Sequence, residues 1–220
     1  LPLWDPHIFA GHPFLANGQH SALYPLSIVF YVLPLWRAYG VFAWLQLSLA
    51  GTFTYLFVRV LGVRRLGALM AGITFQFSGF MVISSVPHPM IVAAALWLPF
   101  ILAMAELVIQ QRPALGRRPA TLPWALLGAI GLGCHMLAGH AENTGLVMLV
   151  TGAYIAWRLL TNKTADPSTN QRLGWLIAWW TGSRRAIVWL SVMLVLCLLL
   201  VAVQFVPYLE AVRSGFRGGE

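Results

Sequence analysis

Six apolar stretches separated by short polar turns leave few folds open to this chain. A helix needs about 20 mostly apolar residues to cross the hydrocarbon core of a bilayer. Backbone groups in lipid must also find their hydrogen-bond partners within the protein. We therefore expect an all-α, polytopic transmembrane protein with about six spans. The stretches cover residues 40–60, 66–83, 90–110, 122–139, 145–160 and 186–206.

The scarcity of charge supports the same conclusion. Only 9% of the 220 residues are charged, whereas soluble domains carry about 25%. The formal net charge of +8 is interpreted as the basic residues that flank membrane spans, so nucleic acid is not an expected partner. Cys134 and Cys197 both lie inside apolar runs, which argues against a disulfide and against a cysteine metal pair.

The chain is interpreted as one transmembrane domain, residues 1–220, belonging to a longer protein. Residues 1–24 are expected to form an ordered outer loop, because the segment combines aromatic residues with polar ones and carries no Lys or Arg. Residues 25–36 are apolar but too short to cross, so they predict an interfacial helix that Pro34 ends. Residues 40–209 then form the helix bundle.

The basic residues predict the orientation of the spans. When the turns are assigned alternately to two sides, 11 of the 14 Lys and Arg residues fall on one side, which is therefore expected to be cytoplasmic. The opening loop then lies outside. The eleven residues are Arg59, Arg64, Arg65, Arg112, Arg117, Arg118, Arg158, Lys163, Arg172, Arg184 and Arg185; the other three are Arg37, Arg213 and Arg217.

Polar side chains gather on the predicted outer face. Such a gathering in a membrane protein indicates a water-accessible site. The histidines and amides there could line that site, and the alternative is that they cap helix ends and satisfy each other. The candidate binding residues are His12, Asn17, Gln19, His20, His88, His140 and Asn143, with Asp5 and Glu142 as the carboxylates of the same face.

Two stripes of small or polar residues indicate close helix packing. One comprises Gly67, Ala71, Thr74, Ser78, Met81 and Ser85, and the other Gly128, Gly131, His135, Ala138 and Glu142. His135 would either donate a hydrogen bond between helices or ligate a pigment.

Four stretches resemble YfhO-type bacterial multi-pass membrane proteins, which are similar to GT-C glycosyltransferases. The most specific is LPLWDPHIFAGHPFLANGQHSALYPLS at residues 1–27. The others are ITFQFSGFMVISSVPHP with the following LWLPF, then MLAGHAENTG, and FVPYLEAVRSGFRGGE. The resemblance implies a protein of the bacterial cytoplasmic (inner) membrane.

The resemblance also implies a chemistry. A GT-C-like enzyme would transfer a sugar from a polyprenyl phosphate at the outer face, with membrane lipid as its surroundings. An acidic residue of the first outer loop would act as base or metal ligand. That residue is expected upstream of Leu1, so the catalytic residue is unknown, and Asp5 and Glu142 are weak candidates. The lipid-linked sugar donor is the implied cosubstrate; a divalent metal stays open, although the histidine spacing does not predict a metal site.

A different class of function stays open beside the enzyme. The chain would then be a non-catalytic transmembrane subunit of a larger membrane complex, binding pigment, lipid or other membrane subunits. A proton-coupled transporter is disfavoured because no span carries a central ionisable residue.

Overall fold

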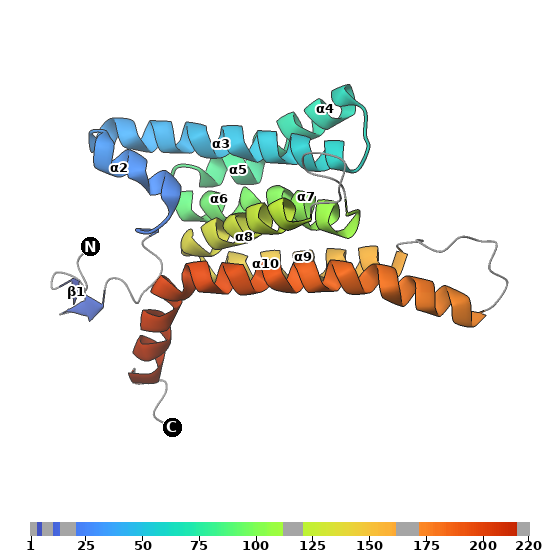
Figure 1. The fold of residues 1–220 in the computed structure, drawn as a ribbon. Helices are drawn as coiled ribbons and strands as arrows, with labels where there is room; N and C mark the ends of the chain where they lie inside the picture. Colours follow the sequence, from blue (N-terminus) through green and yellow to red (C-terminus); the bar gives the residue numbers. More distant parts are fainter. Residues whose placement is uncertain (1–3, 6–10, 14–20, 112–120, 162–171, 215–220) are drawn as a thin grey trace.

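The computed structural model describes residues 4–5, 11–13, 21–111, 121–161 and 172–214. Two-residue strands, β1 (Trp4–Asp5) and β2 (His12–Pro13), pair antiparallel near the start. The other regular elements that the structure describes are all helices (Figure 1). The helices are η1 (Pro25–Ile28), α2 (Val29–Val32), α3 (Leu35–Val60), α4 (Arg65–Gln76), α5 (Gly79–Ser84), α6 (Pro89–Ala95), α7 (Trp97–Ile109), α8 (Leu122–Leu137), α9 (Ala141–Thr161) and α10 (Arg172–Ser214).

The sequence predicts about six spans, and four helical segments among the described residues are long and apolar enough to cross a membrane. They are Leu35–Val60, Pro89–Ile109, Ala141–Thr161 and Ser183–Glu210. The second of these combines α6 and α7, which are separated only by a turn at Leu96. Helix α8 is also apolar, but its 16 residues make only about 24 Å of helix, less than the four longer segments. The chain thus has the helices of a membrane protein.

The stretch 66–83 does not form the single helix that its hydropathy predicts. Helix α4 ends at Gln76, and α5 begins only at Gly79. Between them Ser78 adopts an extended backbone with ψ 146°, so the helical hydrogen bonds stop there. At 12 residues, α4 is about 18 Å long, which is well short of the roughly 30 Å hydrocarbon core.

The packing face of α4 also differs from the prediction. The predicted stripe is wrong here, because the buried residues of α4 are Ala68 and Gly72 rather than Gly67 and Thr74. Gly72 lies against α3: a Cβ built on it would come 2.7 Å from the Gly51 carbonyl oxygen. Backbone contact this close requires glycine at the crossing of α3 and α4.

The predicted interfacial segment 25–36 is also divided. It forms η1 and α2, which end at Val32, and α3 already begins at Leu35. Pro34 occupies the N-cap of α3, where the helix needs no backbone N–H from it. Trp36 therefore belongs to the long helix rather than to the short one.

The combined α6–α7 segment is the centre of the bundle. Within it, 72% of the most apolar 18-residue window is buried, against 11% in α9 and 22% in α3. Helices α3 and α8 pack on α7, and α10 packs on α8. Figure 1 shows these helices running along a common axis, with α10 bending sharply toward its C-terminal end, where Pro207 lies inside the helix.

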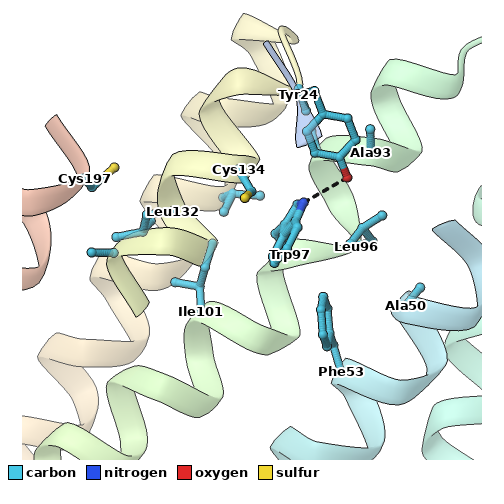
Figure 2. Close-up of a cluster of buried hydrophobic side chains, with 14 of the residues drawn as sticks. Tyr24, Ala50, Phe53, Ala93, Leu96, Trp97, Ile101, Leu132, Cys134 and Cys197 are labelled. Carbon is cyan, nitrogen blue, oxygen red and sulfur yellow. Dashed lines mark hydrogen bonds between the residues drawn. The ribbon is translucent and has the colours of Figure 1, made fainter. Parts of the chain in front are cut away.

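Aromatic side chains join the core to the opening segment. Tyr24 and Trp97 point toward one another in Figure 2, and the Trp97 Nε1–H donates to Tyr24 Oη over 3.1 Å. The Trp97 ring also packs on Phe53 of α3, with ring centroids 5.1 Å apart. Tyr24 is 2% exposed, so the segment just before η1 is anchored in the core.

The stripe on α8 is confirmed as a packing face. Gly128, Gly131, His135 and Ala138 are all buried, whereas Glu142 at its end is exposed.

Candidate functional site

The turn between α8 and α9 positions two of the predicted site residues. Gly139 follows the end of α8 with φ 80°, the left-handed conformation that commonly closes a helix. His140 comes next, immediately before α9. Its Nδ1 accepts a hydrogen bond from the backbone N–H of Asn143 at 3.2 Å. His140 thus caps the first turn of α9, as Asn or Ser side chains do in other helices.

Asn143 ties this turn to α6. Its Nδ2 donates to the Ile91 carbonyl oxygen over 3.2 Å. Ile91 lies three residues after His88, whose side chain is exposed at the start of α6. The beginnings of α6 and α9 therefore lie together, which places the His88 and His140 turns at the same end of the bundle.

The end of the opening segment docks on the same turn. The hydroxyl of Ser21 donates to the Ala138 carbonyl oxygen over 2.5 Å, one residue before Gly139. The Ser21 carbonyl accepts in turn from the hydroxyl of Ser27 at 2.8 Å and from the backbone N–H of Tyr24 at 3.1 Å. Ser21 has a φ of 49°, so this corner is held in a conformation that non-glycine residues seldom adopt.

Tyr24 completes the corner as a neutral group. Burial raises the pKa of its phenol well above the ordinary value, and the hydrogen bond from Trp97 lowers it by less. The hydroxyl consequently keeps its proton at physiological pH.

Helix α6 receives polar side chains from three neighbouring helices. Gln46 of α3 donates to the Pro89 carbonyl over 3.1 Å, and Asn143 of α9 bonds to Ile91 as described. His135 of α8 lies with Nδ1 2.9 Å from the Ala94 carbonyl oxygen. Because a carbonyl only accepts, Nδ1 carries the proton in this bond. His135 is thus an interhelical hydrogen-bond donor, one of the two roles expected for it.

The other candidate residues have no described side-chain hydrogen bond to the turn between α8 and α9. Asp5 and His12 lie opposite each other in the register of β1 and β2. Glu142 is exposed in the first turn of α9. Asn17, Gln19 and His20 lie outside the described residues. Within the described part of the chain, no group of three His, Cys, Asp or Glu side chains could hold a metal ion.

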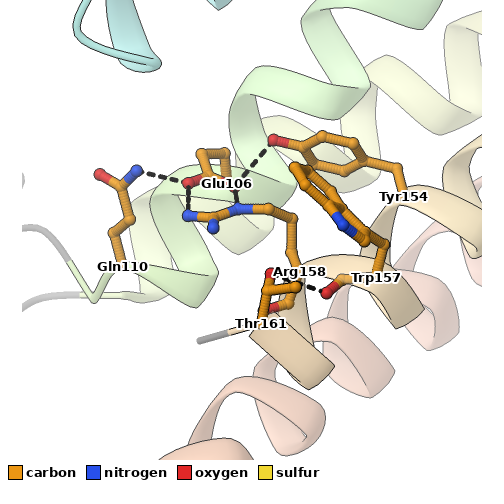
Figure 3. A network of polar contacts seen from close by, with 6 residues as sticks. All are labelled: Glu106, Gln110, Tyr154, Trp157, Arg158 and Thr161. Atoms are coloured by element: carbon orange, nitrogen blue, oxygen red, sulfur yellow. Dashed lines mark hydrogen bonds and ion pairs between the residues drawn. The ribbon is translucent and has the colours of Figure 1, made fainter. Parts of the chain in front are cut away.

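A polar cluster at the opposite end of the bundle was not anticipated. The fully buried Glu106 carboxylate of α7 accepts from Nε of Arg158 at 2.7 Å and is also bonded to Nη2 of the same guanidinium (Figure 3). The hydroxyl of Tyr154 donates to it over 2.8 Å, and Nε2 of Gln110 supplies a fourth bond. All four donors converge on one carboxylate, so its charge is paired and its oxygens are saturated.

This ionic cluster, defined as Glu106, Gln110, Tyr154 and Arg158, is remote from the predicted site. Arg158 lies 18 residues after His140, or about 27 Å along α9. The positions of two charges in their helices could have predicted this cluster. Glu106 and Arg158 each lie three residues before the end of their helix. Because one antiparallel helix separates α7 from α9, these two helices run parallel, and the two charges therefore lie at the same depth in the bundle.

No family model, curated protein or solved structure matches this chain.

Proposed function

We propose that this chain is part of a GT-C-like membrane glycosyltransferase of the YfhO type, which transfers a sugar from a polyprenyl phosphate at the outer face of the bacterial cytoplasmic membrane. The observation that carries the proposal is the docking of Ser21 on the turn that holds His140 and Asn143. The end of the segment with the strongest family resemblance thereby lies against a second resembling stretch, MLAGHAENTG.

The distribution of charge supports an outer location for this site. Six basic residues lie at the C-terminal ends of α3 and α9, at the start of α4 and at the start of the α10 span. In Figure 1 these helix ends lie on the side of the bundle away from the turn between α8 and α9. Arg37, in the first turn of α3, and Arg213, in the last turn of α10, lie at the opposite ends of their helices. Basic residues accumulate on the cytoplasmic side of membrane proteins. The six are Arg59, Arg64, Arg65, Arg158, Arg184 and Arg185. In this orientation α4–α5 and α8 complete a six-span bundle.

The roles of the site residues follow from their chemistry. His140, Asn143 and the exposed His88 would hydrogen-bond sugar hydroxyls or the donor phosphate, together with His12, Asn17, Gln19 and His20. The acceptor hydroxyl needs a base, for which a carboxylate upstream of Leu1 is proposed and Glu142 is the described alternative. A divalent metal would require ligands beyond the described residues.

The non-catalytic subunit is the second candidate, and one observation favours it. Both His140 and Asn143 already bond to backbone groups, as structural caps do. In that case the turn holds α9 against α6, and the exposed apolar helices contact other membrane subunits or lipid.

A conservative substitution separates the two candidates. His140→Ser keeps a side-chain acceptor for the α9 N-terminus but removes the imidazole. In the full-length protein, reconstituted with polyprenyl-phosphate-linked hexoses, we expect sugar transfer to fall about ten-fold or more while the melting temperature is retained. His140→Ala, which removes both functions, is the matched comparison. Full transfer activity in the Ser variant would make His140 a helix cap and withdraw it from the mechanism.

A further inference from the structure

Two adjacent arginines mark the point where α10 enters its apolar span. Arg184 and Arg185 are both exposed, and the 28-residue span Ser183–Glu210 begins directly before them. They lie well inside α10, whose first turn is at Arg172, so backbone N–H groups are not free at this point. Figure 1 shows α10 continuing past the ends of α3 and α7 on this side.

A cavity of about 390 Å³ lies at this pair, and among the described residues its lining comprises Arg184, Arg185, Val188 and Trp189. Val188 follows Arg184 by four residues and Trp189 follows Arg185 by four, so each guanidinium stands above an apolar residue on the same face of the helix. Trp189 packs against the hydrophobic core, which fixes one wall of the cavity. Val188 is 52% exposed and continues into the exposed apolar face of α10.

No described carboxylate neutralises this pair. Glu106, at the same end of the bundle, is bonded to Arg158. The other described carboxylates belong to the opposite end: Glu142 lies in the first turn of α9, Glu210 lies 25 residues after Arg185, and Asp5 lies in β1 (Figure 1). Among the described residues the cavity thus combines two positive charges with an apolar floor.

We propose that this cavity binds the headgroup phosphate of an anionic phospholipid, with one acyl chain lying on Val188 and the apolar face below it. Guanidinium groups bind phosphate through paired hydrogen bonds, and basic pockets at the ends of membrane helices suit anionic headgroups. The phosphate comes from a lipid rather than from solution, because the half-exposed Val188 in the cavity lining and the exposed apolar residues that follow it on α10 offer a surface for an acyl chain.

Lipid retention by the full chain tests the proposal. The purified protein in detergent is titrated with phosphatidylglycerol and, separately, with phosphatidylcholine, and bound lipid is counted by native mass spectrometry. We expect phosphatidylglycerol to bind at least ten-fold more tightly than phosphatidylcholine, with an affinity that falls as salt rises. Arg184→Gln/Arg185→Gln should lose about ten-fold of that affinity.

The chain supplies a matched control in Arg64 and Arg65, a second exposed adjacent pair at the start of α4. Arg64→Gln/Arg65→Gln removes the same charge and should leave phosphatidylglycerol binding within two-fold of the parent. Equal losses in the two double variants would overturn the proposal, as would equal binding of the two lipids or full displacement of phosphatidylglycerol by inorganic phosphate. Should the Gln variant fail to fold, Arg184→Lys/Arg185→Lys replaces it: the point charges remain but the paired geometry is lost, and an unchanged affinity would refute guanidinium recognition.

Discussion

Arg158→Met is expected to be the most damaging single substitution in the ionic cluster. It removes two of the four donors on Glu106, and the carboxylate is left buried with Tyr154 and Gln110 alone. Hydrogen bonds to charged groups contribute about 1.5–3 kcal/mol each. Removing one partner of a buried ion pair costs about 3–5 kcal/mol. Two such bonds together contribute about 3–6 kcal/mol, which overlaps the range for a broken buried ion pair, so we expect the free energy of unfolding to fall by about 3–5 kcal/mol.

The double variant Glu106→Leu/Arg158→Met should be more stable than the single variant Arg158→Met, although it carries one substitution more. With both charges replaced by apolar side chains, no unpaired charge stays buried, and such replacements are often neutral or stabilising by about 1–4 kcal/mol. We expect the double variant to recover most of the loss of the single one. Equilibrium unfolding in mixed micelles with rising sodium dodecyl sulfate measures all three proteins.

The control for this series is Arg64→Met, which removes an exposed arginine at the same end of the bundle. It should change stability by no more than about 0.5 kcal/mol. Our account of the cluster fails if Arg158→Met lies within about 1 kcal/mol of the parent. It fails equally if the double variant is no more stable than Arg158→Met.

Two further substitutions, Gly72→Ala with Gly152→Ala as its control and Tyr24→Phe, test the packing in the same unfolding assay. Gly72→Ala places a Cβ 2.7 Å from the Gly51 carbonyl oxygen and should lower the free energy of unfolding by about 1–3 kcal/mol. The control Gly152→Ala, whose Cβ meets open space in α9, should raise the free energy of unfolding by about 0.5–1 kcal/mol. Equal losses of stability in the two variants would contradict the close crossing of α3 and α4. Tyr24→Phe keeps the ring but leaves the buried Trp97 Nε1–H without its acceptor, so we expect the free energy of unfolding to fall by about 1–3 kcal/mol. Unchanged stability would show that this hydrogen bond does not hold the opening segment.

Long helices could be predicted from the sequence because lipid imposes a length and an apolar composition on them. This reasoning located α3, the α6–α7 segment, α9 and the span within α10. It failed at Phe77–Ser78, because hydropathy averages over a window and carries no information on a single extended residue. The sequence FSG at that point offered the signal, since Ser and Gly favour turns over helix interiors.

The sequence predicted at which end of the bundle the candidate site lies, but it did not predict which residues contact one another there. Alternation of the turns placed His88 and His140 at one end, where the Asn143–Ile91 bond also holds them. The donors to α6, however, come from Gln46, His135 and Asn143, which are far apart in the sequence. Their convergence depends on the rotation of three helices about their axes, and that is set by tertiary packing.

Helix α9 is fastened to the central segment at two points, which restricts how the protein can move. Asn143 holds its first turn to α6, and Arg158 holds its last turn to α7. The two attachments are 15 residues, or about 22 Å, apart along the helix. A helix attached at one end can rotate about that end, but a helix attached at both ends cannot do so without breaking one attachment. We therefore expect α6, α7 and α9 to move as one rigid unit in any opening of the bundle. The hinge would then lie at their contacts with α3 or with α8 and α10.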